Sequence, residues 1–444
     1  MVRIKQPNWP QALGQFLRPF AAELGHQAQR KWCPVYVQGL LTQIERKSIR
    51  PLADVIAPGQ HEQLHHFISK SGWSTQPLED VLAFQAQRLV GNDGVLIVDD
   101  TSLPKTGTHS VGVAHQYCGV LGKMANCQTL VSLTLARDGL PVPIALRLFL
   151  PSAWTDDPQR CQRAGVPVER QLHRTKLTIA LDEIDRLVDL GLRFKVVLAD
   201  AGYGNGASFR QGLSARGLQW VVGIQPHQKV YPLDVQVPHV VRTHKRGRPQ
   251  KHAVPDQASR AVQVVLTDLP PQSWRTVVWR QGSKGPLQAR FVVRRVRVGD
   301  GEKTRGGIHL PGEEVWLIGE WRTNGEKRFY LSNLPKNTSN RQLIKVAKQR
   351  FWCELGHQQL KGELGLDHFE GRSWQGLHHH ALLCMVALAF VQEIRRKKSY
   401  ALMTVPQVLR VMGGSFGTVM NTGCPCCGWE SHARGSPQMY NGIA

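Results

Sequence analysis

Apolar residues recur at helical spacing through the first 90 residues of the chain. One apolar stripe consists of Leu13, Phe16, Leu17 and Phe20, and a second consists of Val81, Leu82, Phe84 and Leu89. A period near 3.6 residues is typical of amphipathic helices. Prolines interrupt the pattern at positions 51, 58 and 77. We therefore expect residues 1–90 to form a mostly α-helical domain.

Short apolar runs replace the helical period from Val95 onwards. Buried strands are expected at 95–98, 131–135, 144–150, 196–199 and 220–224. Helical spacing returns at 177–188 and 208–216. Strands that come first and then alternate with helices indicate an α/β sheet with at least one crossover, which we place at residues 91–224.

The composition becomes β-rich between residues 225 and 335. Further strands are expected at 261–266, 276–279, 291–298, 315–319 and 329–331. We interpret 225–335 as an insertion domain, because helical spacing resumes at 342–361 and in a buried helix near 381–395. Residues 336–398 would then complete the α/β unit, and 399–444 would form a tail rich in Gly, Cys and Pro.

The charge of the chain indicates a polyanionic partner. Of 444 residues, 56 are Lys or Arg and 33 are Asp or Glu, which gives a net charge of +23 spread along the sequence. Nucleic acid is the commonest such partner, and a ribosomal-type or merely soluble basic protein is the alternative. The N-terminus lacks the apolar segment of a signal peptide, and the apolar run 381–391 is too short to cross a bilayer. We expect a cytoplasmic protein without membrane contact, whose nine cysteines are reduced.

Three charged residues of the segment 342–361 share one side of its helix. At about 100° per residue, Glu354 lies about 40° and Lys361 about 20° from Arg350. A surface ladder of ion pairs would explain this stripe equally well.

Acidic residues also follow two of the predicted strands. Asp99 and Asp100 end the strand 95–98, and Asp200 ends the strand 196–199. Ligands collect at strand ends in open α/β sheets, and two carboxylates there suit Mg²⁺ or Mn²⁺. Such ions serve phosphodiester chemistry, and Glu354 would complete the acidic set. An aspartate at a strand end can also be a helix cap or a turn residue.

With these acidic residues, the sequence resembles the DDE transposases of bacterial insertion sequences, in the IS-four-type branch with a Y-x2-R-x3-E-x6-K signature. The resemblance covers about residues 36–393. It rests on the order and spacing of several stretches: Val98-Asp-Asp-Thr101, Gly107-Thr-His-Ser-Val-Gly112, Gln116-Tyr-Cys-Gly-Val-Leu-Gly-Lys123, Asn126-Cys-Gln128, Trp154-Thr-Asp-Asp157, Ala199-Asp-Ala-Gly-Tyr-Gly204 and the segment from Glu363 to Trp374.

The resemblance implies a ribonuclease-H-like core with a β-rich insertion before the last acidic helix. It implies Asp100, the acid before Thr101, as first acid in preference to Asp99, with Asp200 second and Glu354 third. These three would bind two Mg²⁺ or Mn²⁺ ions. The implied reaction opens a transposon end and joins its 3′-hydroxyl to target DNA, on double-stranded DNA held by a homodimer in the bacterial nucleoid.

Further DNA contacts are expected around this core. The resemblance gives Arg350 and Lys361 a role in contacting phosphates. Lys123 and Gln128 are of residue types that bind phosphate and sugar, although a solvated loop is an equal alternative. Arg246 and Arg248 lie in a short motif that resembles an AT-hook, which reads a narrow minor groove.

The sequence departs from the signature at Ala347, where the family has tyrosine. A hairpin intermediate during excision is therefore not predicted either way. Phe351 and Trp352 could stack on a displaced base, or they could belong to the core. The acids at 363, 367 and 370 are alternatives to Glu354. The histidines 378–380 are expected to be structural or to face phosphate, because consecutive helix positions cannot share a metal. Cys424, Cys426 and Cys427 have no second pair for a zinc site.

The sequence thus predicts a transposase that binds the terminal inverted repeats of its own element. Two alternatives stay open, a structure-selective nuclease on the same core and a transposase-derived DNA-binding protein without activity.

Overall fold

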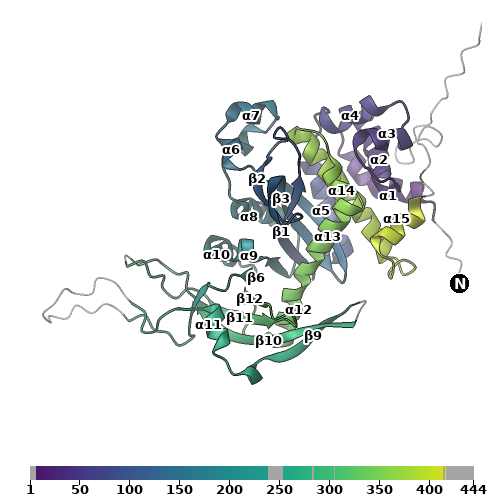
Figure 1. Ribbon diagram of the computed structural model, residues 1–444. Helices are drawn as coiled ribbons and strands as arrows, with labels where there is room; N and C mark the ends of the chain where they lie inside the picture. The colour runs from purple at the N-terminus through teal and green to yellow at the C-terminus, as the bar shows by residue number, and fades with distance from the viewer. Residues whose placement is uncertain (1–6, 239–253, 283–284, 305, 414–415, 417–444) are drawn as a thin grey trace, which may run out of the picture.

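The computed structural model describes residues 7–238, 254–282, 285–304, 306–413 and 416 (Figure 1). Arg246, Arg248 and the three cysteines at 424, 426 and 427 lie outside the described residues. The six cysteines within the described residues are all buried, and none of them forms a disulfide there.

Five helices precede the sheet, which confirms the helical spacing of the first 90 residues. They are α1 (Trp9–Ala22), α2 (Gln27–Leu41), α3 (Ile49–Ile56), α4 (His61–Ser69) and α5 (Gln76–Val90). Pro51 and Pro77 lie in the first turns of α3 and α5, where no intrahelical N–H bond is lost. These two prolines therefore begin helices, as well as separating them from the preceding segments.

The central part of the sheet contains β1 to β6. Their bounds are β1 (Val95–Pro104), β2 (Ala114–Cys118), β3 (Lys123–Arg137), β4 (Leu140–Leu148), β5 (Val196–Ala199) and β6 (Trp220–Ile224). Strand β1 pairs antiparallel with β3 on one edge and parallel with β5 on the other, and β5 pairs parallel with β6. This mixed sheet, with its helices, is consistent with a ribonuclease-H-like core.

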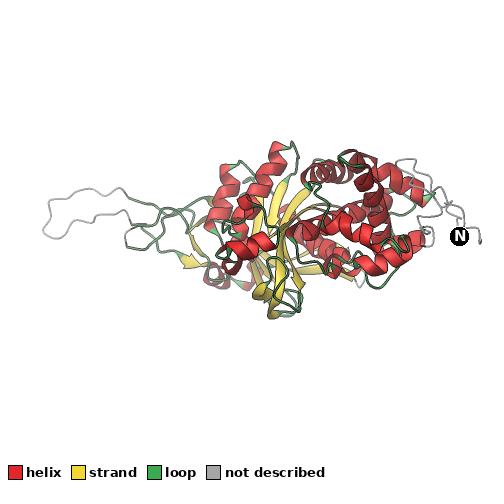
Figure 2. Cartoon of the chain, turned by 90° about the horizontal axis from the view of Figure 1, so that it is seen from above, coloured by secondary structure: helices red, strands yellow, loops and turns green. Residues whose placement is uncertain are grey.

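Helices connect and cover these strands. Between β4 and β5 lie α6 (Ser152–Thr155), α7 (Pro158–Arg163), a short 3₁₀ turn at Val168–Arg170 and α8 (Lys176–Asp189). After β5 come α9 (Ala201–Gly204) and α10 (Ala207–Ala215). Asp157 caps α7 by accepting from the Arg160 backbone N–H at 2.9 Å. Seen from above, the strands lie between two groups of helices (Figure 2).

The β-rich region extends the same sheet. Its elements are β7 (Lys229–Tyr231), β8 (Arg260–Ala261), α11 (Val262–Thr267), a 3₁₀ turn at Pro271–Ser273, β9 (Arg275–Gly282), β10 (Gly285–Val298), β11 (Glu314–Trp321) and β12 (Lys327–Ser332). Strand β12 pairs antiparallel with β6, so the hydrogen-bonded ladder runs without interruption from the core into this region.

One predicted strand in this region is wrong. Residues 261–266 were expected to be extended, but α11 begins at Val262. Val262 and Leu266 are buried at the i and i+4 positions of the helix, while Val264 is exposed. Packing at helical spacing therefore overrides the β-propensity of this valine-rich run.

The last helices return to the core. They are α12 (Asn340–Ala347), a 3₁₀ turn at Lys348–Arg350, α13 (Phe351–Gly362), a second 3₁₀ turn at Leu366–His368, α14 (Trp374–Arg396) and α15 (Val405–Gly413). Helix α14 is long and apolar enough to cross a membrane by composition, but 94% of its most apolar window is buried inside the protein. It is thus a packed central helix beside α2, α4 and α5 (Figure 1).

Two hydrophobic clusters lie on the two faces of β1. Leu96 and Val98 belong to the larger cluster, which also contains residues of the five N-terminal helices and of α14. Val95 and Ile97 belong to a smaller cluster with residues of α12 and with Cys353 of α13. Because side chains alternate along a strand, each position of β1 is assigned to one of these faces.

The neutral imidazole of His380 links α14 to α2 and to the segment around Gly365. Its Nε2–H donates to the Gly365 carbonyl oxygen at 3.0 Å, and its Nδ1 accepts from the Tyr36 hydroxyl of α2 at 2.8 Å. Burial lowers the pKa of His380 from about 6.5 to about 4. All three histidines 378–380 are buried, so of the two roles expected for them the structural one applies.

We predict that acid destabilises the protein through this histidine. Its folded pKa lies below its unfolded value, so its contribution is complete above pH 6.5 and is lost as the pH falls towards 4. The loss amounts to about 3 kcal/mol. Urea unfolding between pH 7 and pH 4.5 should show a shallower pH dependence for His380→Gln than for the wild type. The exposed His109 gives a control, since His109→Gln should keep the wild-type slope; equal slopes for all three proteins would contradict the prediction.

Candidate active site

Asp99 and Asp100 lie on opposite faces of β1. Asp99 follows Val95 and Ile97 onto the face covered by α13, and Asp100 follows Leu96 and Val98 onto the other. The Asp99 backbone oxygen accepts from the Ser132 hydroxyl of β3 at 3.1 Å, and Asp99 Oδ1 accepts from the Asp100 N–H at 2.8 Å. The double acid of the sequence therefore supplies one carboxylate to each side of the sheet.

Asp200 lies beside Asp99 at the end of the neighbouring parallel strand. The register pairs Val98 with Ala199, and one further residue along each strand brings Asp99 level with Asp200. Asp200 also caps α9, because its Oδ1 accepts from the Tyr203 N–H at 3.3 Å. The cap fixes the carboxylate at the strand end, so the helix-cap role and a site role coexist in this residue.

Arg350 bridges the acids. Its Nη1 lies 2.5 Å from Asp99 Oδ2, and its Nη2 forms an ion pair with Glu354 one turn further along the helix. The 3₁₀ turn at Lys348–Arg350 delivers this guanidinium to β1. The stripe predicted for Arg350 and Glu354 is thus real, but it faces the acids of the sheet and is not an isolated surface ladder.

The carboxylates affect one another strongly. Burial raises the pKa of Asp99 to about 7, Arg350 opposes this shift, and Asp200 and Asp100 add to it. Burial also raises the pKa of Asp200, again opposed by Arg350. Burial alone would lower the pKa of Arg350, but Asp99, Glu354 and Asp200 outweigh this effect and hold it above its usual value. The site therefore concentrates negative charge around one fixed cation.

Asp100, which the resemblance selects as first acid, has different partners. Its Oδ2 lies 2.6 Å from Lys176 Nζ at the start of α8, and its Oδ1 accepts from the Tyr203 hydroxyl at 2.6 Å. Both partners belong to segments on the face opposite to α13. Arg350 thus contacts Asp99 and Glu354 directly and feels the charge of Asp200, whereas Asp100 is engaged by Lys176 and Tyr203.

The remaining residues expected to contact DNA differ in accessibility. Lys361 is half-buried and donates to the Ser102 carbonyl oxygen of β1 at 3.1 Å, and burial lowers its pKa. Gln128 is fully buried and donates to the Val111 carbonyl oxygen at 2.6 Å, so the expected DNA contact is wrong for Gln128, whose side chain tethers the loop before β2. Lys123 is exposed at the start of β3.

The two aromatic residues at the start of α13 differ in their surroundings, since one is exposed and the other packs against the core. Phe351 is 41% exposed, and the Arg280 guanidinium lies over its ring at 4.3 Å from the centroid. Trp352 lies under the same guanidinium at 4.8 Å and packs against the smaller cluster. Ala347 is buried in that cluster at the end of α12, before the 3₁₀ turn changes the helical phase. Position 347 therefore faces the core and leaves the stripe of Arg350.

The alternative acids lie elsewhere. Glu370 forms an ion pair with Arg46, and Asp367 lies next to His368, 4.0 Å from its Nε2. Glu354, with 51% of its side chain exposed, is the acid of this region that contacts Arg350.

A buried polar group behind Asp99 was not foreseen from the sequence. Cys353 and His357 lie one turn apart on α13, with 3.5 Å between Sγ and Nε2, and Ser132 Oγ lies 2.7 Å from the same Nε2. Ligand atoms of Asp99, Cys353 and His357 all lie within 4.8 Å of one another. Burial lowers the pKa of His357 to about 3 and raises that of Cys353, so both are uncharged at neutral pH. The i, i+4 spacing of Cys353 and His357 was the available signal.

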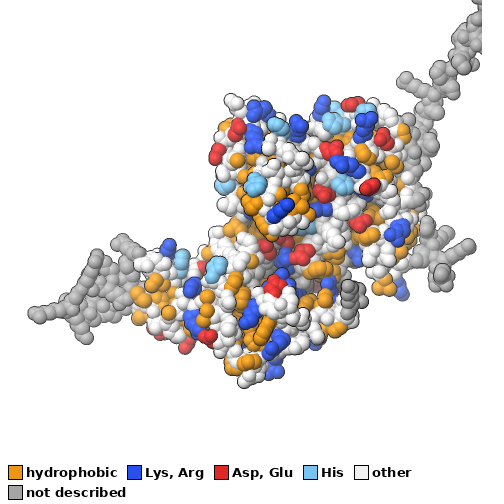
Figure 3. All heavy atoms as spheres, in the orientation of Figure 1, with side chains coloured by type: hydrophobic (Ala, Val, Ile, Leu, Met, Phe, Trp, Pro, Cys, Tyr) orange, Lys and Arg blue, Asp and Glu red, His pale blue; other side chains and the backbone are white. Residues whose placement is uncertain are grey.

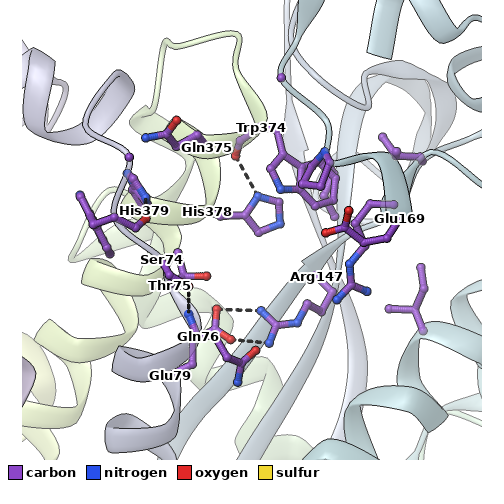
Figure 4. A pocket seen from close by; sticks show the side chains of 18 of the residues that line it. Ser74, Thr75, Gln76, Glu79, Arg147, Glu169, Trp374, Gln375, His378 and His379 are labelled. Carbon is purple, nitrogen blue, oxygen red and sulfur yellow. Dashed lines mark hydrogen bonds and ion pairs between the residues drawn. The ribbon is translucent and has the colours of Figure 1, made fainter. Parts of the chain in front are cut away.

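One cavity of the protein lies apart from the acids around Arg350. Acidic and basic side chains gather in a hollow above the β9 to β12 region (Figure 3). A cavity of about 440 Å³ lies elsewhere, between α5, β4 and the start of α14 (Figure 4). There, buried Arg147 is ion-paired with Glu79 and Glu183, and His378 Nδ1 bonds the Trp374 carbonyl oxygen at 2.8 Å. This cavity contains none of the acids around Arg350.

Comparison with known proteins adds a family to this geometry. The family model of the DDE superfamily endonucleases matches the sequence over residues 19–286, which is more than half of the chain. The match includes Asp99, Asp100 and Asp200 and ends before Glu354. The chain is also 26% identical, over 333 residues and 74% of either sequence, to a probable transposase for insertion sequence element IS701 from Microchaete diplosiphon.

We predict that Arg350 competes with divalent cations for the acids. Arg350→Ala removes the charge that neutralises Asp99 and Glu354, so Mn²⁺ should bind the DNA-free protein at least about fivefold more tightly. Manganese titration followed by electron paramagnetic resonance measures this affinity. Arg295, which pairs with Glu314 in the β-rich region, offers a control, because Arg295→Ala should leave Mn²⁺ binding unchanged. Weaker binding by Arg350→Ala would show that the guanidinium supports the site and does not compete for it.

Proposed function

We propose that this chain, which belongs to the DDE superfamily of endonucleases, is a DNA transposase. It would cut the ends of its own element and join them to target DNA. One observation carries the proposal. Asp99, Asp200 and Glu354 meet around Arg350 at the end of two parallel strands of a ribonuclease-H-like core. A chain with a net charge of +23 is suited to a polyanionic substrate.

We propose Asp99 as first acid, where the resemblance alone favoured Asp100. Asp99 shares a face with Asp200 and α13, whereas Asp100 is engaged by Lys176 and Tyr203. Asp100 would then be a positioning residue, because its two bonds hold the ends of β1, α8 and α9 in place.

The donor set fits divalent cations. Carboxylate oxygens are the ligands that Mg²⁺ and Mn²⁺ prefer, and crowding of the acids raises the pKa of Asp99 and Asp200 in a way that added positive charge would relieve. Asp99, Asp200 and Glu354 would hold two such ions. When bound, these ions activate the attacking oxygen and stabilise the leaving one.

The protein's own side chains would orient the DNA. Arg350 is the fixed cation nearest the acids, and a phosphate between them would accept its guanidinium hydrogens. Lys361 supports β1 through Ser102, and Phe351 presents an exposed ring beside Arg280 for stacking. The Arg246 and Arg248 segment is proposed to grip the minor groove. Terminal inverted repeats and target DNA would be held by a homodimer.

A strand-transfer assay tests the reaction. A pre-cut element end, Mg²⁺ and a plasmid target are combined with the full chain. Joined product supports a transposase, nicking without joining indicates a nuclease, and binding without either product indicates an inactive DNA-binding protein.

Amide substitutions test the assignment of the acids. Asp99→Asn, Asp200→Asn and Glu354→Gln should each reduce cleavage by more than about a hundredfold, because each removes a charged ligand, while DNA binding is retained. Asp100→Asn should keep more activity than Asp99→Asn. Gel-based cleavage and mobility-shift titration measure the two effects. An active Asp99→Asn beside an inactive Asp100→Asn would return the first position to Asp100.

The N-terminal helices are proposed to recognise the element ends. Arg18 of α1 and Arg50 of α3 are exposed basic residues in this region. Arg18→Glu with Arg50→Glu in the full chain should weaken binding to the terminal repeat more than binding to random DNA, and should flatten its salt dependence. Parallel titrations of both duplexes at several salt concentrations measure this; an equal loss on both would contradict end recognition by this region.

A further inference from the structure

The hairpin formed by β2 and β3 continues beyond the body of the sheet. Strand β1 ends where Pro104 pairs with Cys127, and from there to the turn β3 pairs with β2 alone, through Cys118 opposite Lys123. The ribbon is held at both ends, because Gln116 Nε2 donates to the Cys127 carbonyl oxygen at 2.9 Å near its base and Cys118, next to the turn, is buried. The hairpin is therefore a firm projection with a free tip.

The tip carries an unusual number of exposed apolar side chains. They are Tyr117, Val120, Leu121 and Met124, which are 63%, 56%, 47% and 52% exposed. In the described parts of the chain, no other stretch of eight residues has more than two exposed large apolar side chains. Gly122 closes the turn with a φ of 64°, a conformation that side-chain-bearing residues rarely adopt. Exposed apolar residues concentrated at one place mark an interaction surface.

The position of the hairpin relates it to the acids. Lys361 of α13 donates to the Ser102 carbonyl oxygen of β1 at 3.1 Å, near the base of the hairpin. Glu354 lies two turns back on the same helix, about 10 Å along its axis. Figure 3 shows a lobe of apolar side chains around one cation, over β2 and β3 and above the hollow with acidic side chains.

The charge around the tip indicates the class of partner. From Ala114 to Cys127 the hairpin contains no Asp or Glu, and its one Lys or Arg is Lys123. Lys123 is exposed in the tip itself. A partner that accepts both this charge and an apolar insertion is a DNA duplex, which offers phosphates outside and stacked bases inside.

We propose that the tip from Tyr117 to Met124 is a wedge that enters the duplex beside the scissile phosphate and separates base pairs there. Leu121, Met124 and Tyr117 would replace the stacking of the separated step, and Lys123 would contact the adjacent phosphate. This inference rests on the proposed function, since it requires DNA at the acid site. Separation of the strands would let one strand reach Asp99, Asp200 and Glu354.

The test compares paired and pre-separated DNA. The double variant Tyr117→Ser with Leu121→Ser is expected to cleave a fully paired terminal-repeat duplex about tenfold more slowly than the wild type. On the same duplex with mismatched pairs at the cleavage junction, the rates should agree within about threefold, because the unstacking cost has been removed in advance. Leu402, which is 99% exposed, supplies the matched control Leu402→Ser, expected to behave as wild type on both.

A second measurement does not depend on catalysis. In the Asp200→Asn background, 2-aminopurine placed at the junction should brighten or shift on binding when the wedge is intact, and not when Tyr117 and Leu121 are serine. Normal binding with the same fluorescence change in both proteins would overturn the wedge and leave the transposase proposal intact. Absence of any preference of the wild type for the terminal repeat would instead count against the proposed function. A changed oligomeric state of the DNA-free variant, measured by sedimentation, would make the tip a protein contact and also overturn the proposal.

Discussion

Strand β1 is hydrogen-bonded along both edges, and the groups of the site take their positions from this double pairing. The antiparallel pairing with β3 fixes the register of β1, and the parallel pairing with β5 brings Asp200 level with Asp99. Because both faces of β1 are covered by hydrophobic clusters, a slip of one residue would expose Val95 and Ile97 to the wrong cluster. The position of the acids is thus held by burial of the apolar residues that precede them.

Much of the fold could be predicted from the spacing of apolar residues. The strands of the core, the N-terminal helices and the helix with Glu354 all leave a clear period in the sequence. The helix α11 does not, because a run such as Val262 to Leu266 is compatible with either structure until its packing partners are known.

The sequence predicted which residues belong to the site better than it predicted how they are arranged in space. Val95 to Val98 are all apolar, since both faces of β1 are buried, so the sequence carries no indication of which face Asp99 or Asp100 occupies. Gln128 resembles a DNA-binding residue in the sequence, and only the packing of the loop around Val111 reveals its burial. Cys353 and His357 become a polar cluster with Ser132 through a contact between elements more than 200 residues apart.

The pairing of β12 with β6 limits how far this chain could be shortened. An insertion that made no hydrogen bonds to the core could be deleted without exposing a strand. Here, deletion of the β-rich region would leave β6 with an open edge of unpaired N–H and C=O groups. Open edges recruit strands from other molecules, so a shortened protein would tend to aggregate before it lost its acids. The β-rich region therefore covers the edge of β6 that the core alone would leave open.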